Sequence, residues 1–447
     1  MPLTRKLKTL LLCSLSVILI SCGNSEKENG PVVIRYWEKW NGFEADAMRL
    51  IVDDFNASQD EIFVEYSSVS QIDRRLMLAI AGGIPPDVAG LWNHALPVYA
   101  ENNALTPLNR YTEAAGIGRE DYISIYWDMC THRNYLWALP STPASTALIY
   151  NKKMFREAGL DPERPPRSIA ELEAYNAKLM KRDESGRLIA CGHIPAEPGW
   201  WSPNWVYWFG GDLWDGAETI TADSPENIEA YRWVQSYPER FGARDLMSFK
   251  DGFGNFASPQ NPFFTGRVAM VLQGPWIYNF IKNYAPEDFE WGVAPFPSVN
   301  PELFPNVTLV ESDILVIPAG AEHPDEAFAF IQFVNSQVEM EKLCLAQRKF
   351  SPLAETSAGF FEEHPNPYIG EFIDLAKSPQ AKTLPGTTVW SLYANEMRQA
   401  FGSVWTQTAT TEEVLSEVQI RMQENFDHRA RRWKRMEETL LTEWEKP

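Results

Sequence analysis

The chain has 447 residues, more than one hydrophobic core usually serves, so we expect two domains. Hydrophobic residues make up 45% of the sequence and charged residues 22%, which is typical of a globular protein and argues against disorder. The formal net charge of -20 argues against a nucleic-acid partner, because binding to phosphates requires concentrated lysine and arginine.

The N-terminus has the pattern of an exported lipoprotein. A basic start, RKLK at residues 5–8, precedes the run LLLCSLSVILI, which is too short to span a membrane comfortably and is typical of a signal peptide. The run ends in LISC at residues 19–22, which resembles a bacterial lipobox. We therefore expect a signal peptide over residues 1–21, lipidation of Cys22, and a polar tether over 22–30. The alternative is an ordinary cleaved signal peptide.

Strands alternate with amphipathic helices after the expected tether. VVIRYW predicts a strand, ADAMRLIVDDF places apolar residues on one helical face, and IFVEY predicts a second strand. A further helix closes at Gly82-Gly83, and Pro85-Pro86 lead into the strand DVAGL. This alternation implies right-handed crossovers and a largely parallel sheet covered by helices, so the expected fold class is α/β.

The rest of the chain repeats this pattern less regularly. ALIYN at residues 147–151 predicts a strand, and Ser168 with Glu171 forms a capping-box pattern at the start of a helix. DILVIP predicts another strand, followed by a helix with Pro324 in its first turn. The tail from Thr411 has the pattern of a long, charged amphipathic helix.

Cysteine and histidine spacing does not predict a metal site. Cys13 leaves with the signal peptide and Cys22 belongs to the anchor, so Cys130, Cys191 and Cys344 remain. An odd trio at wide spacing is neither a disulfide framework nor a zinc motif, and at most one bridge can form, which the spacing does not identify. The six histidines are scattered without a metal-binding spacing, and we expect neither a metal nor a cofactor.

Several stretches, taken in order, resemble the extracellular solute-binding proteins of ABC importers, specifically the carbohydrate-binding group that includes maltose-binding protein. The matching stretches include AIAGGIPPDVAGLW, YLWALPSTPASTALIYNKKMFREAGL, FFTGRVAMVLQGPW, WGVAPFPS and ILVIPAGAEHPDEAFAFIQFV. With the start VVIRYWEKWNGFEADAMRLIVDDFN and the stretch NALTPL, they span most of the chain behind the lipobox.

The resemblance implies a periplasmic-binding-protein-like fold with two discontinuous α/β lobes and a ligand cleft between them. The chain is expected to cross between the lobes three times, near Thr142–Ala144, Val310–Ser312 and Phe350–Pro352. The first lobe then comprises residues 31–142 and 311–349, and the second comprises 143–310 and 350–447.

The resemblance also implies a function. We expect a monomeric lipoprotein, held on the outer side of a bacterial membrane (in the periplasm or at the cell surface), that binds a sugar or oligosaccharide. Hinge closure would trap the ligand through its higher affinity for the closed state, and the permease of an ABC transporter would recognise closure. Catalysis is not part of the family's function.

A sugar has C–H faces and a rim of hydroxyl groups, so its site needs aromatic rings and polar edge groups. In the family motif that GRVAMVLQGPW resembles, the tryptophan after Gly-Pro, here Trp276, stacks on sugar. Trp92 follows the strand DVAGL at the carboxyl edge of the sheet, with Asn93 as an edge hydrogen-bonding group. Glu38 and Trp40 occupy the same place after the first strand, although residues 37 and 38 point to opposite faces and one is expected in the core.

The second lobe contributes a dense aromatic segment, EPGWWSPNWVYWFGGD. Its polar half suggests that Trp200 and Trp201 face the ligand, whereas Trp205 and Trp208 share one helical face and are expected in the core. The remaining candidates are Glu311 and Ser312 at a crossing, and Trp390. Lys39 departs from the maltose-binding pattern, which has an acidic ligand residue nearby, so a maltodextrin ligand does not follow.

Two other functions fit some of these residues. A polyamine-binding relative would also use tryptophan with acidic residues such as Glu38 and Glu311. A secreted carbohydrate-active enzyme would need two carboxyl groups about 5–10 Å apart, for which Glu38, Glu197 and Glu311 are available. Because the chain has no nucleophile elbow, metal motif or phosphate loop, we expect a binding protein and no enzyme.

Overall fold

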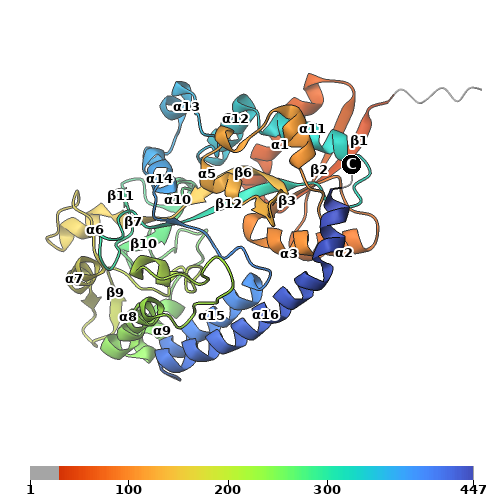
Figure 1. The fold of residues 1–447 in the computed structure, drawn as a ribbon. Helices are drawn as coiled ribbons and strands as arrows, with labels where there is room; N and C mark the ends of the chain where they lie inside the picture. The colour runs from red at the N-terminus through yellow and green to blue at the C-terminus, as the bar shows by residue number, and fades with distance from the viewer. Residues whose placement is uncertain (1–29, 446–447) are drawn as a thin grey trace, which may run out of the picture.

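The structure, a computed structural model, describes residues 30–445 (Figure 1). The expected signal peptide, the expected lipidation site Cys22 and nearly all of the expected tether lie outside the described residues. Within the described part of the chain, no helix is both long enough and apolar enough to cross a bilayer.

The largest sheet has six strands in the order β13-β12-β3-β1-β2, with β6 also paired to β12. It forms the first lobe and continues along β12 to β13, which pairs with Thr308 and Leu309 beside the core of the second lobe. Its strands are β1 (Val32–Glu38), β2 (Ile62–Ser68), β3 (Val88–Trp92), β6 (Ala138–Ser145), β12 (Thr308–Val316) and β13 (Ala381–Lys382). β1 is parallel to β2 and β3, as the alternation of strands and helices predicts, whereas β12 is antiparallel to both β3 and β6.

Helices cover this sheet because each has one apolar face. Met48, Ile51 and Phe55 of α1 are buried, as are Phe330 and Ile331 of α11. The helices and minor elements of this lobe are α1 (Gly42–Ser58), α2 (Ile72–Ala81), η1 (Asn93–Ala95), α3 (Leu96–Glu101), α4 (Asn109–Ala115), η2 (Arg119–Asp121), α5 (Ser124–Asp128), β4 (Thr131–His132), β5 (Tyr135–Leu136), α11 (Pro324–Val334), α12 (Gln337–Gln347) and α13 (Ala358–Glu363).

The second lobe has a smaller sheet in the order β10-β7-β11, formed by β7 (Ala147–Asn151), β10 (Met270–Gln273) and β11 (Trp291–Ala294). Both of its pairings are antiparallel, so the expectation of a largely parallel sheet is wrong for this lobe. The remaining elements are α6 (Lys152–Glu157), α7 (Ile169–Leu179), β8 (Lys181–Arg182), β9 (Leu188–Ala190), η3 (Trp205–Phe209), α8 (Pro225–Phe241), α9 (Ala243–Asp251), α10 (Ile277–Tyr284), α14 (Ile369–Ala376) and α15 (Trp390–Trp405).

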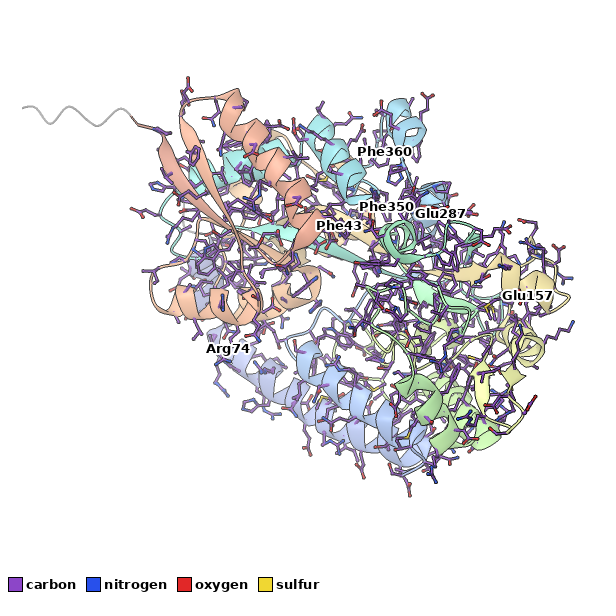
Figure 2. All side chains as sticks on the ribbon, turned by 180° about the vertical axis from the view of Figure 1, so that it is seen from behind. Phe43, Arg74, Glu157, Glu287, Phe350 and Phe360 are labelled. Atoms are coloured by element: carbon purple, nitrogen blue, oxygen red, sulfur yellow. The ribbon has the colours of Figure 1, made fainter. Side chains whose placement is uncertain are left out.

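Two strands run side by side between the lobes. β6 and β12 pair antiparallel from Ala138 with Val316 to Ser145 with Val310. At one end of this ribbon Leu139 lies in the hydrophobic core of the first lobe, and beyond the other end Ala147 lies in the core of the second. Figure 2 shows Phe350 where the two lobes meet. The ribbon therefore connects the two lobes through two hydrogen-bonded strands.

The C-terminal helix α16 (Thr411–Trp444) contacts both lobes. Its first half packs Leu415 and Met422 into the core of the second lobe, and its end packs Trp433 and Trp444 into the core of the first. Figure 1 shows the helix running from α15 toward α2. The expected assignment of all of 350–447 to the second lobe is therefore wrong for the end of this helix, because an amphipathic pattern does not say which core the apolar face meets.

The same correction holds for Leu353 and Phe360, which also lie in the core of the first lobe. The three cysteines in the described residues, Cys130, Cys191 and Cys344, are buried and free, so none of them forms the bridge that their number allowed. Burial raises the pKa of all three thiols and keeps them in the uncharged form.

Candidate ligand-binding groove

A groove between the two lobes consists of two joined compartments. The ion-lined compartment, of 360 Å³, lies beside Lys39, Asp313 and Lys349. The aromatic compartment, of 710 Å³, lies beside Trp200, Trp201 and Trp390. Trp92, Trp276 and Glu311 line both compartments, so the two are direct neighbours in the groove.

Trp276 enters this space because of the Gly-Pro that precedes it. Pro275 cannot donate to a sheet ladder, and β10 ends at Gln273. A Cβ atom on Gly274 would overlap the six-membered ring of Trp276, so only glycine allows the indole to lie across this position. The indole N–H of Trp276 donates to the side-chain oxygen of Gln273 over 2.9 Å, which fixes the ring orientation.

Other tryptophans line the groove around this ring. Trp201 stacks on Trp276 with ring centroids 6.4 Å apart and donates its indole N–H to the carbonyl of Leu272 over 2.9 Å. Trp200 is half-exposed and packs edge-on against Phe256. Trp92 comes from the opposite lobe, at the end of β3, and is 42% exposed, so a large apolar ring faces the groove from that side.

The ion-lined compartment has a buried cluster of alternating charge. Asp313 Oδ1 lies 2.9 Å from Lys39 Nζ, and Asp313 Oδ2 lies 3.2 Å from Lys349 Nζ. Lys39 Nζ also lies 3.1 Å from Glu38 Oε1, and Lys349 Nζ lies 3.0 Å from Glu44 Oε1. Both ammonium groups face the Trp40 ring, 5.0 and 5.6 Å from its centroid. Each buried cation therefore has two carboxylate partners.

The protonation of the carboxyl groups follows from these neighbours. Burial alone would raise the pKa of Asp313, but Lys39 and Lys349 outweigh burial and lower it to about 2. Burial, with a smaller contribution from the charge of Asp313, raises the pKa of Glu311 to about 7. The site therefore combines a firmly ionised carboxylate with a carboxyl group that is partly protonated near neutral pH.

Eight of the ten ligand-binding candidates line the two compartments. They are Trp40, Trp92, Trp200, Trp201, Trp276, Glu311, Ser312 and Trp390. The two expected core tryptophans, Trp205 and Trp208, are buried among apolar residues of the second lobe. Glu311 and Ser312 face Ala144 and Pro143 across the ribbon, so two of the expected crossings are hydrogen-bonded neighbours.

Glu38 and Asn93 lie outside the two compartments. Glu38 is fully buried and accepts hydrogen bonds from the hydroxyl of Tyr36 over 2.6 Å and from the backbone N–H of Lys39 over 2.7 Å. The placement of Glu38 against the ligand is therefore corrected: β1 continues to this residue, so its side chain shares the inward face with Tyr36. Asn93 is also buried, and its side-chain oxygen accepts the N–H of Ser312 over 3.3 Å.

Asp313, Lys349 and His94 also line the groove, although they were not among the residues expected from the sequence. A register irregularity between Ser312 and Ile314 breaks the strand alternation, so residues 311–313 all line the ion-lined compartment. Lys349 immediately precedes the third expected crossing at Phe350–Pro352. Its position in the sequence could therefore have indicated that it lies in the groove. The imidazole of His94 stacks on Trp92 with centroids 6.0 Å apart, and burial, helped by Lys39, lowers the pKa of His94 to about 4.

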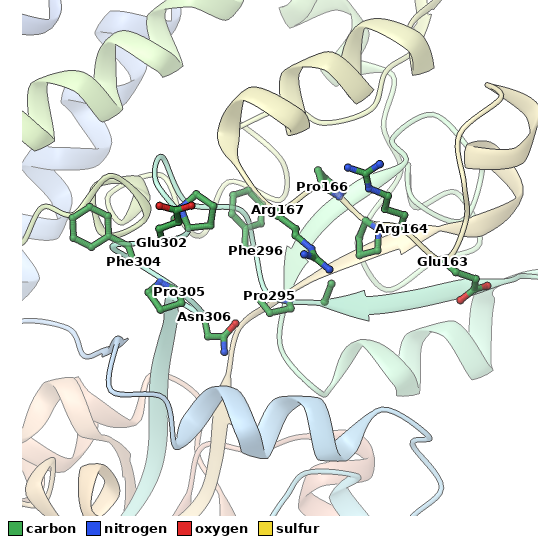
Figure 3. Close-up of a pocket in the computed structure, with 14 residues that line it drawn as sticks. Glu163, Arg164, Pro166, Arg167, Pro295, Phe296, Glu302, Phe304, Pro305 and Asn306 are labelled. Carbon is green, nitrogen blue, oxygen red and sulfur yellow. The ribbon is translucent and has the colours of Figure 1, made fainter.

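A separate cavity of 660 Å³ lies in the second lobe (Figure 3). Proline-rich loops around Pro166, Pro295 and Pro305 form its walls together with Phe296 and Phe304. It shares no lining residue with the groove and contains none of the candidates from the sequence. The described residues contain no cluster of His, Cys, Asp and Glu that could hold a metal ion.

The chain matches a family model described as bacterial extracellular solute-binding protein over residues 42–341, more than half of its length. It is 22% identical to the maltotriose-binding protein of Pyrococcus abyssi over 71% of this chain and 65% of that protein. It is 21% identical to the sn-glycerol-3-phosphate-binding periplasmic protein UgpB of Pectobacterium atrosepticum over 92% and 94%. The structure of CpMnBP1 with mannobiose bound superposes with a TM-score of 0.77 at 26% identity, covering 87% of this chain and 99% of that one.

Proposed function

Because this chain belongs to the family of bacterial extracellular solute-binding proteins, we propose that it binds a sugar or oligosaccharide in the groove and delivers it to the permease of an ABC transporter. The observation that carries this proposal is the position of Trp92 and Trp276. They come from different lobes and line the same two compartments together with Glu311 of the hinge strand β12. A ligand that contacts both indoles favours the closed arrangement of the lobes over the open one.

The chemistry of the groove suits a polyol. Indole rings offer flat apolar surfaces to the C–H faces of a sugar, and tryptophan loses little conformational freedom when it binds. The carboxyl groups of Asp313 and Glu311 and the hydroxyl of Ser312 offer hydrogen-bonding groups to the hydroxyl rim. The relatives with maltotriose in their name and mannobiose in their structure have ligands of this kind.

A phosphate ester fits the ion-lined compartment less well. Lys39 and Lys349 are its buried cations, and Glu38, Glu44 and Asp313 already neutralise them. An anion placed here would compete with these carboxylates rather than meet unpaired positive charge. Arg398 is exposed and lines the aromatic compartment, so it does not change the charge balance of the ion-lined compartment. We therefore favour a neutral ligand over the glycerophosphate named for UgpB.

The location and the partners extend the same proposal. Lipidation of Cys22 would hold the protein on the outer face of a bacterial membrane, and the tether would let the lobes reach the permease. The relatives are named as binding proteins rather than enzymes, which supports delivery of the ligand intact. Acyl labelling of the full-length chain, compared with a Cys22→Ser variant, tests the anchor separately: equal labelling of the two would exclude it.

The test of ligand class uses purified protein that lacks residues 1–22. Tryptophan fluorescence and calorimetry are followed while manno-oligosaccharides, malto-oligosaccharides, sn-glycerol-3-phosphate or a diamine is added. We expect saturable binding of at least one saccharide, with a decrease in the radius of gyration by X-ray scattering. Binding of the diamine or the phosphate ester alone would reject the carbohydrate assignment. Breakdown of the saccharide during the titration would reject a pure binding function.

A further inference from the structure

The groove continues beyond the aromatic compartment. A third compartment of 530 Å³ shares His94 and Leu384 with the aromatic compartment, just as the latter shares Trp92, Trp276 and Glu311 with the ion-lined one. At the junction His94 stacks on Trp92 with their planes inclined by 12°. The stacked rings of Trp92 and His94 therefore lie where the second and third compartments meet.

The third compartment also lies between the two lobes. The first lobe contributes Thr131 of β4 and Asp128 of α5, and the second contributes Trp214 and Asp212 beyond η3. Like the rest of the groove, the third compartment therefore has one wall from each lobe, and closure of the lobes would bring these walls together. Asn93, which lies outside the first two compartments, is part of this one.

The groups around this space suit hydroxyls rather than a charged ligand. Trp214 offers an indole ring to this space. Asp212 is paired with Lys382, and Asp128 is paired with Arg119. The third carboxylate that lines this space, Asp215, accepts hydrogen bonds from the backbone N–H groups of Ala217 and Thr219. His94, with its lowered pKa, is neutral near pH 7 and can both donate and accept a hydrogen bond.

We propose that the ligand is an oligosaccharide longer than a disaccharide and that the third compartment binds the end of the chain farthest from Lys39. This inference rests on the proposed carbohydrate-binding function and adds the length of the ligand to it. Small-molecule sites usually have volumes of about 300–1,000 Å³, and each of the three compartments lies in that range by itself. One or two sugar rings would leave at least one compartment filled with water.

The experiment measures affinity against chain length. The protein that lacks residues 1–22 is titrated with manno- and malto-oligosaccharides of two to five units. We expect the affinity to rise about tenfold or more between two and four units. In a Thr131→Trp variant, whose new side chain extends from an exposed position into the third compartment, this rise should disappear while the disaccharide affinity stays within threefold. A Trp214→Ala variant should reduce the rise in the same way.

The control is Trp291→Ala, which removes a half-buried indole that lies outside all three compartments and should leave the length dependence unchanged. Thermal unfolding of each variant shows whether it is folded, and Thr131→Trp remains informative if Trp214→Ala is not. Affinity that does not depend on length, or a rise that survives Thr131→Trp, overturns the inference but leaves the carbohydrate assignment intact. If no saccharide of any length binds, the proposed function fails and the inference falls with it.

Discussion

The indole rings of Trp201 and Trp276 stack with centroids 6.4 Å apart and planes inclined by 26°. Both N–H groups are satisfied within the same short strand region, one by the carbonyl of Leu272 and the other by the side chain of Gln273. The pair is therefore held in place before any ligand arrives, which lowers the conformational entropy lost on binding. This pre-organised surface is the basis of the first two predictions.

Trp276→Ala should weaken saccharide binding by about 30-fold or more, which corresponds to roughly 2 kcal/mol for the loss of a central aromatic contact. The indole is only partly buried and packs mainly on Trp201, so the folded state should survive. Calorimetric titration measures the affinity, and Trp291→Ala is the matched control. An unchanged dissociation constant would remove Trp276 from the site.

Gly274→Ala should weaken binding without removing any group that can touch the ligand. The added methyl group overlaps the position of the Trp276 ring, so the indole must rotate away from the groove and lose its hydrogen bond to Gln273. We expect a fall in affinity of about tenfold or more, comparable in direction with that of Trp276→Ala. Gly402→Ala, where an added Cβ meets nothing within 4 Å, is the control. Equal affinity of the Gly274 variant and the wild type would contradict the role of this glycine.

Glu311→Gln should raise stability at high pH. Burial raises the pKa of Glu311 to about 7 from its ordinary value of 4.5, so the charged form is disfavoured in the folded protein. The resulting cost is fully present above pH 7 and absent below about pH 4.5. We therefore expect the substitution to stabilise the ligand-free protein by roughly 2 kcal/mol more at pH 8 than at pH 4.5. Urea unfolding at the two pH values measures this gain in the free energy of unfolding. An equal gain at both values would be evidence against a raised pKa of a buried Glu311.

Asp313→Asn should destabilise the protein by about 3–5 kcal/mol at pH 7, because it leaves Lys39 and Lys349 with one carboxylate partner each in a buried site. The pKa of Asp313 is lowered to about 2 from 3.8, so its contribution is present above about pH 4 and is lost as the pH falls toward 2. The difference in the free energy of unfolding between the wild type and Asp313→Asn should therefore become smaller as the pH falls from about 4 toward 2.

Asp128→Asn is the control for this cluster. Asp128 pairs with Arg119 at the surface, where both side chains are about half exposed, and such pairs contribute about 0–1 kcal/mol. Denaturant unfolding of the two variants between pH 2 and pH 7 separates the buried from the exposed pair. If both substitutions lower the free energy of unfolding by the same amount, the buried ion pairs of Asp313 do not stabilise the protein more than an exposed pair does.

Trp444→Ala should destabilise the first lobe while leaving the groove intact. The ring of Trp444 packs edge-on against Trp137 at 4.6 Å, and its N–H donates to Asn103 over 2.9 Å. Loss of a buried tryptophan costs about 3–5 kcal/mol. Ile420→Ala, an exposed position on the same helix, should cost less than about 0.5 kcal/mol. A Trp444→Ala variant as stable as the wild type would mean that α16 does not bind the first lobe.

Local patterns in the sequence were sufficient for the elements and for most of the site. The periodicities predict β1, β7, α11 and the long helix α16, because apolar spacing follows from the geometry of each element alone. Trp92 was selected because it follows a predicted strand, whereas Trp276 and Glu311 were selected from what the resemblance to the solute-binding family implies, and all three line the groove. The alternation of strands and helices predicted the α/β class, the order of the motifs implied the two lobes through the family resemblance, and the structure and its relatives confirm both.

The tertiary structure alone decided which distant segments meet. Lys39, Asp313 and Lys349 come from three separate parts of the chain, and their charges balance only after β12 has joined β3. Tertiary contacts also decided three other features. They are the inward position of Glu38, the antiparallel sheet of the second lobe and the attachment of α16 to both cores. In each case the spacing of apolar residues predicts which face of a helix or strand is apolar, whereas the path of the chain determines what that face contacts.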